Sequence, residues 1–468
     1  MIVTRYVFTY RMTDTRYLLI NSLTGAVDLA DKKVVEAFSS IRHGRSPDLP
    51  DDTIGALSRR GYLYPSRCDE ESLIDRAVEL NEQFRARTQA LCFVLCPTVS
   101  CNLRCPYCFE PHALHKKRNL MTAGQVDKAF SALDSIRLTR PDIPNASINL
   151  FGGEPLQRFT RPIVERILQA AVARELPVSI TSNGSNAHHF VDMLLPHRRR
   201  IMFDISIDGV KDIHDRRRFT ANGNGTFDRI VQNVTLLLGH EFNVAVRMNV
   251  NEANVDAVPE FLEFVRDQGW NRHENFQLNV SPITNYTGNA AEGLLAPSEV
   301  ERRLRERIST GLRAEVPVSL NGDISRLTLP LSDIVGTSMT PGEFMPSIYY
   351  CEASGALFYC MGPDGLVYPC NQILGSPEWA IGTYDPELRI DAEKAAMWQG
   401  RKVTNMPKCR ECSIAFMCSG GCPVMAKRST GSPTDSYCGN AKAELAAYIR
   451  AIAPDIITGP IASSGPSQ

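Results

Sequence analysis

The sequence has no uninterrupted apolar run of about 18 residues, so no membrane-spanning helix is expected. The first residues, MIVTRYVFTYRMTDTRY, also lack the apolar core and the small-residue cleavage site of a signal peptide. A net charge of −1 leaves no large basic field of the kind that binds nucleic acid. These absences predict a cytoplasmic protein that binds neither a membrane nor nucleic acid.

Extremes of composition are missing too. Hydrophobic residues make up 43% of the chain and charged residues 22%, which argues against wholesale disorder, collagen and coiled coil. The length of 468 residues corresponds to about three globular domains.

Cysteine, in contrast, is abundant, with 14 residues. Structural disulfides are rare in the reducing cytoplasm, so another role is expected. Three cysteines lie within residues 101–108 and eight more within residues 351–438, while Cys68, Cys92 and Cys96 stand apart. Clustered thiols of this kind indicate ligands of a metal or of an iron–sulfur cluster. Cys92 and Cys96 belong to an apolar strand, where buried packing is their expected role.

The sequence pattern divides the chain into five ranges. Residues 1–88 are expected to form a small winged-helix-like domain with a linker helix, because two alternating strands precede helices with apolar spacing. Residues 89–300 alternate strand and helix, and residues 301–345 form a bridge. Residues 346–445 are rich in cysteine, glycine and proline, so metal clusters are expected to hold them together. Residues 446–468 are expected to end a helix and continue as a disordered tail.

Six apolar strands are expected in the second range, with helices between several of them. Their sequences are LCFVLCP, SINLFGG, PVSITSNG, IMFDISIDG, NVAVRMNV and NFQLNVSPI. Repeated strand–helix units predict the α/β class with a parallel sheet, and six of them suit an open, partial (β/α)6 barrel. In a parallel barrel the chemistry lies at the carboxyl ends of the strands, and the polar motifs of this chain lie there.

Cys101, Cys105 and Cys108 follow the first of these strands, with three and then two residues between them. Three thiolates on so short a loop can bind three irons of a 4Fe-4S cluster and leave the fourth iron open to a small molecule. Zinc is the alternative, because His112 or His115 could supply the fourth ligand that a structural zinc site requires.

This C-x3-C-x2-C sequence after the first strand of a partial barrel resembles the motif of the radical S-adenosylmethionine (SAM) enzymes. The resemblance implies that the open iron binds the amino and carboxylate groups of SAM. It also implies that the reduced cluster cleaves SAM to a 5′-deoxyadenosyl radical, which abstracts hydrogen from an unactivated carbon. By the same resemblance, Tyr107 lies near the adenine.

Motifs at the ends of later strands strengthen the resemblance. Residues 152–155 are similar to the family's GGEP motif, whose backbone and carboxylate hold the amino group of SAM, and glycine permits a close backbone approach. Residues 181–184 and 206–209 offer short polar groups for the ribose or the carboxylate, and Arg247 is a further partner for the carboxylate. The implied SAM-binding residues are Tyr107, Gly152, Gly153, Glu154, Pro155, Ser182, Asn183, Ser206, Asp208 and Arg247.

The later cysteines resemble the SPASM extension of radical SAM enzymes, which carries two auxiliary 4Fe-4S clusters. The resemblance lies in a C-x2-C-x5-C-x3-C sequence over residues 409–422, in Cys438 after it, and in Cys351 and a G-x4-C sequence before it. The resemblance implies one cluster on Cys409, Cys412, Cys418 and Cys438, and another on Cys351, Cys370 and Cys422, for which Cys360 is the candidate fourth ligand. Three 4Fe-4S clusters per chain are therefore expected. Zinc at the C-x2-C pair is the alternative.

Ligation by Cys360 depends on the register of a predicted hairpin, LFYC-MGPDG-LVYPC. If Met361 pairs with Leu366, Cys360 and Cys370 point to opposite faces. A change of one residue in the loop brings the two cysteines to the same face. If Cys360 is not a ligand, one iron of that cluster is open, and substrate is then one of the groups it can bind.

The SPASM extension is typical of enzymes that modify peptides or proteins. Residues 21–25, 34–41 and 60–63 also resemble, loosely, the peptide-recognition domain of ribosomal-peptide maturases, which binds a leader peptide as an added strand. The resemblance implies a maturase that abstracts hydrogen from a ribosomally synthesised precursor peptide and installs a thioether or carbon–carbon crosslink. Its expected partners are that peptide and an external electron donor such as flavodoxin or ferredoxin. The sequence assigns no general base.

Other interpretations remain open at this point. The first domain resembles a DNA-binding winged helix too, although no strong basic patch supports that role, and it could be a purely structural cap. A sulfatase-maturing enzyme, which forms formylglycine, has the same cluster and extension, but it places a catalytic aspartate where this chain has Asn371. A non-catalytic iron–sulfur electron carrier would explain the cysteines but gives no reason for the GGEP and ribose-side motifs.

Overall fold

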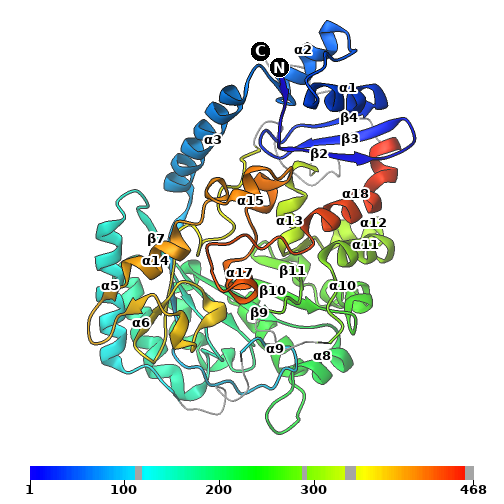
Figure 1. The fold of residues 1–468 in the computed structure, drawn as a ribbon. Helices are drawn as coiled ribbons and strands as arrows, with labels where there is room; N and C mark the ends of the chain where they lie inside the picture. The colour runs from blue at the N-terminus through cyan, green and yellow to red at the C-terminus, as the bar shows by residue number, and fades with distance from the viewer. Residues whose placement is uncertain (111–118, 287–291, 332–343, 459–468) are drawn as a thin grey trace. The chain divides into compact units, whose positions relative to one another are not determined.

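The computed structural model describes residues 1–110, 119–286, 292–331 and 344–458 (Figure 1). It divides into two compact units. The first unit comprises residues 1–88, 323–355 and 401–468, and the second comprises residues 89–322 and 356–400. Within the described residues, no helix combines the length and the apolar character needed to cross a membrane.

The amino-terminal part of the first unit contains two small antiparallel sheets and three helices. The first sheet pairs β1 (Ile2–Val3) with β5 (Leu63–Tyr64), and the second has the order β2 (Val7–Arg11), β3 (Arg16–Asn21), β4 (Val27–Asp31). The helices are α1 (Lys32–Arg42), α2 (Asp51–Arg59) and α3 (Arg67–Thr88). The predicted hairpin, the two short helices and the linker helix are all present.

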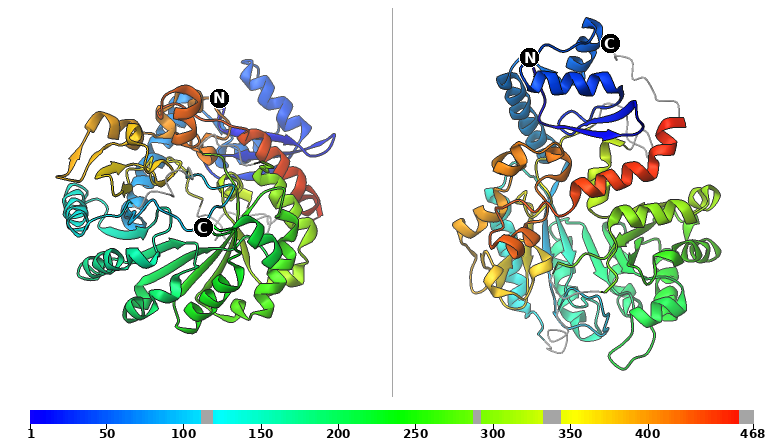
Figure 2. Two further views of the ribbon diagram at one scale, coloured as in Figure 1. Left: turned by 90° about the horizontal axis from the view of Figure 1, so that it is seen from below. Right: turned by 45° about the vertical axis from the view of Figure 1, so that its right-hand side comes forward.

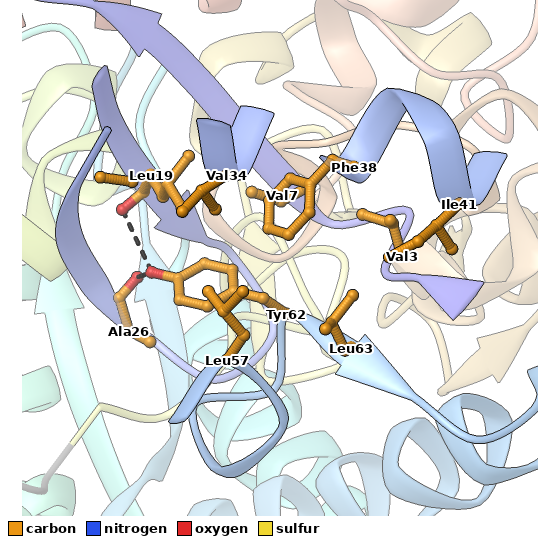
Figure 3. Packing of buried hydrophobic residues seen from close by; sticks show 11 residues of the cluster. Val3, Val7, Leu19, Ala26, Val34, Phe38, Ile41, Leu57, Tyr62 and Leu63 are labelled. Carbon is orange, nitrogen blue, oxygen red and sulfur yellow. Dashed lines mark hydrogen bonds between the residues drawn. The ribbon is translucent and has the colours of Figure 1, made fainter. Parts of the chain in front are cut away.

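One apolar cluster holds these elements together (Figure 3). Phe38 of α1 and Tyr62 before β5 are at most 1% exposed and pack near each other, with ring centroids 6.4 Å apart. The hydroxyl of Tyr62 lies 3.2 Å from the carbonyl oxygen of Leu19, 3.1 Å from that of Ala26 and 2.8 Å from a carboxylate oxygen of Asp28. The buried phenol therefore fixes β5 against the three-stranded sheet.

The rest of the first unit is mostly short helices around loops. They are α13 (Asp323–Leu327), α15 (Pro407–Arg410), α16 (Ala415–Cys418), α17 (Pro423–Thr430) and α18 (Ala441–Thr458). A second apolar cluster joins this part to the amino-terminal part, because Tyr6 packs edge-on against Phe416 at 4.8 Å, and Ile74 of α3 shares the cluster with Val403. The loops that carry the later cysteines are thereby anchored on the amino-terminal helix and sheet.

The second unit contains the predicted parallel strands in chain order. They are β6 (Ala90–Leu95), β7 (Asn145–Leu150), β8 (Val178–Ser182), β9 (Ile201–Ser206), β10 (Asn243–Val250) and β11 (Phe276–Pro282). Each strand pairs in parallel with the next. This arrangement confirms the predicted α/β class and partial barrel.

Helices cover the outer side of these strands (Figure 2, left). They are α5 (Ala123–Thr139), α6 (Arg161–Val172), α7 (Val191–Leu194), α8 (Lys211–Arg217), α9 (Phe227–Gly239), α10 (Val258–Asp267), α11 (Pro297–Arg307) and α12 (Thr310–Glu315). Strand residues facing them, such as Phe203, Val246 and Val280, are 0% exposed. Alternate residues on the other face are polar and only partly buried, such as Asn149 and Asp204. The concave face of the half barrel is therefore polar.

The sheet continues beyond the six strands at both ends. β12 (Val318–Leu320) adds a parallel strand beside β11, and β13 (Phe358–Met361) pairs in parallel with β6. β14 (Leu366–Tyr368), β15 (Gly382–Thr383) and β16 (Arg389–Ile390) follow as antiparallel strands, and α14 (Ala392–Gln399) lies after them. Consequently, residues 356–400 belong to the barrel unit, although the sequence pattern grouped them with the cysteine-rich range 346–445.

The register of the β13–β14 hairpin settles the faces of two cysteines. Met361 pairs with Val367 and Cys360 with Tyr368, one residue away from the register that would separate the cysteines. In this register Cys360 and Cys370 lie on the same face of the hairpin. Their thiols also interact electrostatically, and burial raises the pKa of Cys360.

Candidate functional site

The cysteine triad lies on the loop that leaves the carboxyl end of β6. Cys105 is 8% exposed, and the thiol of Cys101 interacts electrostatically with those of Cys105 and Cys108. Burial raises the pKa of all three thiols, to about 12 for Cys108. Bare thiols would therefore stay protonated here, whereas a bound cationic cluster stabilises the thiolates. The donor set fits an iron–sulfur cluster held by three cysteines.

Among the described residues, no three His, Cys, Asp or Glu side chains converge as the ligands of a single metal ion would. A 4Fe-4S cluster does not require such convergence, because each cysteine binds a different iron. His112 and His115, which the zinc alternative needs, lie outside the described residues.

The GGEP loop packs directly on the segment that precedes Cys101. A Cβ atom on Gly152 would lie 2.6 Å from the carbonyl oxygen of Thr98, and one on Gly153 would lie 2.4 Å from that of Ser100. Gly152 also has a positive φ of 130°. Only glycine permits this approach of two backbones, which brings Glu154 to the cysteine loop.

Glu154 is held beside the triad by the ends of β7 and β8. It is 1% exposed, and its Oε1 accepts hydrogen bonds from the Leu156 amide and the Ser182 hydroxyl, both at 2.8 Å. Its Oε2 accepts one from the Asn183 amide at 2.7 Å. Burial raises the pKa of Glu154, these hydrogen bonds oppose that rise, and the carboxylate interacts electrostatically with the Cys101 thiol. A fixed buried carboxylate in this place suits an ammonium group.

The neighbouring strand-end residues hold the site together. The side-chain amide of Asn183 donates to Oδ1 of Asn102 at 2.8 Å, and so ties the third strand end to the cysteine loop. The carbonyl oxygen of Pro155 accepts from the Thr160 hydroxyl at 2.6 Å, which closes the GGEP turn. Ser206 pairs in register with Arg247 on the next strand.

Asp208 positions Tyr107 through hydrogen bonds among protein groups. The hydroxyl of Tyr107 donates to the Asp208 carboxylate, which is fully buried. Arg217 lies over the Tyr107 ring, 4.9 Å from its centroid, and its Nε donates to Asp208 at 3.3 Å. Arg218 donates from Nη1 to the Tyr107 hydroxyl at 2.7 Å. Asp208 was expected on the ribose side, and in the structure its carboxylate orders the aromatic ring instead of standing free.

Arg218 is a candidate that the sequence analysis missed. It is 8% exposed, and its Nε has no hydrogen-bond partner among the described residues. Its charge interacts electrostatically with Cys105 and with Glu154. A buried guanidinium with a free N–H beside the triad suits a carboxylate. The run of three arginines at 216–218 was the available signal, but a charge run usually marks a solvated surface.

Arg247, the residue expected to bind the SAM carboxylate, lies on β10 and donates from Nη2 to the carboxylate of Asp204 on β9. Its Nε, like Oδ1 of Asp204, has no partner among the described residues. Burial raises the pKa of Asp204, and Arg247 opposes that rise. Arg247 therefore stays a prediction for the carboxylate, beside Arg218.

The set Cys409, Cys412, Cys418 and Cys438 lines one cavity of about 460 Å³ in the first unit. The thiol of Cys409 interacts electrostatically with the other three, and burial raises its pKa to about 12. Four thiols that line one cavity fit a 4Fe-4S cluster with a cysteine on every iron.

The other predicted auxiliary set is divided between the units. Cys351 and Cys422 belong to the first unit, and Cys360 and Cys370 to the second. Within the first unit, Cys351 and Cys422 both interact electrostatically with Arg401. Ligation of one cluster by these four cysteines stays a prediction.

Residues 95–265 match the sequence model of the Radical SAM superfamily. A serine-type anaerobic sulfatase-maturating enzyme of Bacteroides thetaiotaomicron is 22% identical over 362 residues, which are 72% of this chain and 84% of that enzyme. The PqqA peptide cyclase of Ruegeria pomeroyi is 24% identical over 367 residues, which are 73% of this chain and 85% of the cyclase.

A solved structure shares the fold over most of the chain. Streptococcus suis SuiB, crystallised with the precursor peptide SuiA, superposes with a TM-score of 0.55 at 16% identity and covers 94% of this chain and 99% of SuiB. The range matched by the superfamily begins at the end of β6 and ends within α10, so it contains the cysteine triad and the strand ends that face it. The chain therefore contains a radical SAM domain.

Proposed function

We propose that this enzyme is a peptide maturase, which abstracts hydrogen from a ribosomally synthesised precursor peptide and installs a thioether or carbon–carbon crosslink. Two of the compared proteins support a peptide substrate. One is by its name a peptide cyclase, and the other was crystallised with a precursor peptide.

In this proposal Cys101, Cys105 and Cys108 hold the cluster that, together with SAM, supplies the 5′-deoxyadenosyl radical. Glu154 accepts the ammonium group of SAM, and Arg218 or Arg247 binds its carboxylate. Glu154 lies on the loop after β7, Arg218 follows α8 and Arg247 lies within β10, so elements of the half barrel orient the cofactor before substrate enters.

The later cysteines hold two auxiliary 4Fe-4S clusters, which gives three clusters per chain. These clusters accept an electron from the substrate radical or anchor the substrate, and an external flavodoxin or ferredoxin reduces the enzyme. We place this chemistry in the cytoplasm, where thiols remain reduced.

The amino-terminal sheet is the proposed binding site of the leader peptide. In the order β2-β3-β4, each outer strand has one edge without a strand partner among the described residues. An exposed edge offers a row of N–H and C=O groups to which an extended peptide can add as a strand. Alternating side chains of the peptide would then be read by the faces of the sheet.

The observation that carries the proposal is this edge-exposed sheet in a chain that also holds the SAM site. The test is anaerobic incubation of the full chain with SAM, dithionite and the short cysteine-rich or aromatic-rich peptide encoded beside its gene. We expect mass spectrometry to show loss of two hydrogen atoms from the peptide with the wild type and none with Cys105→Ala. Release of 5′-deoxyadenosine while every such peptide stays unmodified would overturn the maturase assignment.

Formylglycine formation is the second candidate, favoured by the sulfatase-maturating relative. In this chain Asn371 follows Cys370, and the thiol lies 3.8 Å from its Oδ1. A carboxamide cannot take up a proton as a catalytic aspartate does. Incubation of the wild type with a cysteine- or serine-containing peptide derived from a sulfatase distinguishes the two functions. Formation of formylglycine would favour this candidate over crosslinking.

A further inference from the structure

Arg401 is a buried positive charge in the cysteine-rich part of the first unit. It is 3% exposed, and the largest electrostatic partners of its guanidinium are four thiols rather than carboxylates. Burial lowers its pKa, and those four thiols oppose the shift. An arginine remains charged in a protein even so, and among the described residues no carboxylate forms an ion pair with Arg401, so its charge needs another compensating group.

The hydrogen bonds of Arg401 end on the loops that carry cysteines. Its Nη2 donates to the carbonyl oxygens of Gly420 at 2.7 Å and of Asp435 at 2.6 Å, and its Nη1 donates to that of Gly421. The two glycines lie between Cys418 and Cys422, and Asp435 lies three residues before Cys438. One guanidinium therefore connects both loops.

The loops adopt a backbone conformation that few residues tolerate, so the rigid guanidinium of Arg401 helps to maintain it. Gly420 and Gly421 both have positive φ, 77° and 73°. A Cβ atom on Gly421 would lie 1.9 Å from the carbonyl oxygen of Tyr437, whose amide in turn donates to the carbonyl of Gly420 at 2.8 Å. The planar fork of arginine can bind several carbonyl oxygens at once, and the single ammonium of lysine lacks that geometry.

The four thiols that interact with Arg401 come in equal parts from the two predicted auxiliary sets. Cys351 and Cys422 belong to one set, and Cys409 and Cys418 to the other. The Nε of Arg401 has no hydrogen-bond partner among the described residues. A 4Fe-4S cluster with four thiolates is an anion, and the net charge around it is one of the factors that set its reduction potential.

We propose that Arg401 is a positioning residue shared by the two auxiliary clusters, which orders the loops carrying their cysteines and raises their reduction potentials through its buried charge. This inference rests on the proposed ligation of those clusters. A fixed cation stabilises the more negative, reduced state, so it favours transfer of an electron to the clusters.

The test compares three full-length variants after anaerobic reconstitution. Arg401→Met removes the charge and keeps an unbranched side chain, and Arg401→Lys keeps the charge but loses the planar fork. Lys402→Met is the matched control, because Lys402 is the adjacent cation but pairs with Glu82 at 3.0 Å. Iron content and EPR-monitored redox titration provide readouts that do not depend on turnover.

We expect about 12 iron atoms per chain in the wild type, as three 4Fe-4S clusters require. In Arg401→Met, at least one auxiliary cluster should become about tenfold harder to reduce, which is a fall of about 59 mV for one electron. Arg401→Lys should recover most of that shift, and Lys402→Met should leave the potentials unchanged.

The outcomes separate this inference from the proposed function. A wild type with about 4 iron atoms overturns the auxiliary clusters and the role of Arg401 with them. Full iron content and unchanged potentials in Arg401→Met overturn only the role of Arg401. If Arg401→Met loses the auxiliary iron, Arg401→Lys separates the two parts of the role. Recovered iron with a near-normal potential supports the buried charge, whereas iron loss equal to that of the methionine variant supports the ordering of the loops and overturns the effect of the charge.

Discussion

The two cysteine-rich regions of the chain differ in what surrounds their thiols. The triad after β6 has a buried carboxylate, Glu154, and a buried guanidinium, Arg218, whose Nε has no hydrogen-bond partner among the described residues. The later set around Cys409 lines a cavity with four thiols, and its nearby cation, Arg401, donates to backbone carbonyls. The first region therefore offers one positive and one negative group to a small zwitterion. The second region presents four thiols, which are the proposed ligands of an auxiliary cluster.

The largest expected effect separates the two regions by function. Cys105→Ala should abolish release of 5′-deoxyadenosine, because the open iron needs all three thiolates of the triad. Cys412→Ala should retain that release and lose modification of the peptide. Chromatographic quantification of 5′-deoxyadenosine and mass spectrometry of the peptide give the two readouts.

Cys68→Ala serves as the control, because Cys68 is exposed on α3 and lies in neither cysteine cluster. It should match the wild type in both assays. If Cys412→Ala also stopped release of 5′-deoxyadenosine, the proposed division of labour between the regions would be wrong.

Glu154→Gln should weaken SAM binding by about 10- to 100-fold, since a buried charge-assisted interaction is worth about 1.5–3 kcal/mol. The glutamine side chain would also point its NH2 group toward hydrogen-bond donors that now donate to the Glu154 carboxylate. Equilibrium binding of SAM to the reconstituted enzyme measures the effect, and Glu175→Gln, an exposed site, is the control. Unchanged SAM affinity in Glu154→Gln would remove this carboxylate from the cofactor site.

Two arginines compete for the SAM carboxylate, and a pair of variants distinguishes them. If Arg218 binds it, Arg218→Lys should raise the KM for SAM about tenfold, because lysine has no counterpart of the unpartnered Nε–H. Arg247→Lys should then change KM little. Steady-state release of 5′-deoxyadenosine at varied SAM concentration measures both, and the reverse order would assign the carboxylate to Arg247.

The last expected effect concerns the pH dependence of folding stability in the barrel region rather than cofactor binding. His214 is fully buried, its Nδ1 lies 3.3 Å from the Asp208 amide, and burial lowers its pKa to about 4. The unfolded chain binds this proton at about pH 6.5, so the folded state loses stability as pH falls from 6.5 toward 4. The loss should be about 2 kcal/mol between pH 7 and pH 5.

Thermal unfolding of the wild type and of His214→Gln at both pH values tests this. The variant should show a smaller loss at pH 5, because glutamine does not titrate. Equal pH dependence in the two proteins would show that other groups control the acid response.

The strands of the half barrel could be predicted because each is an apolar run closed by a turn signal, and β6 to β11 all appear where expected. β12 could not, because it has only three residues and follows the short helix α12, whose six residues give no apolar periodicity. The β13–β14 register was also undetermined, since loop sequence alone allowed either face for Cys360. In the structure Cys360 pairs with Tyr368, and β13 also pairs with β6, a contact between residues far apart in sequence.

The cysteine triad and the GGEP loop could be found from spacing, because their chemistry lies within a few consecutive residues. Spacing did not identify three other residues, which are Arg218, Asp204 and Arg401. Their roles come from burial and from partners such as Tyr107 or Gly420, and a single sequence does not show which of its many arginines is buried. The sequence also predicted a ribose-side role for Asp208. It did not show that the Asp208 carboxylate accepts hydrogen bonds from Tyr107, Arg217 and Asn249.

The most direct test of the central claim is electron–nuclear double resonance on the reduced enzyme with SAM labelled by ¹⁵N at its amino group. The account predicts a hyperfine coupling between that nitrogen and the cluster on Cys101, Cys105 and Cys108, and its loss in Cys105→Ala. Absence of the coupling in SAM-saturated wild type, or a protein nitrogen coupled to the same iron in its place, would contradict it.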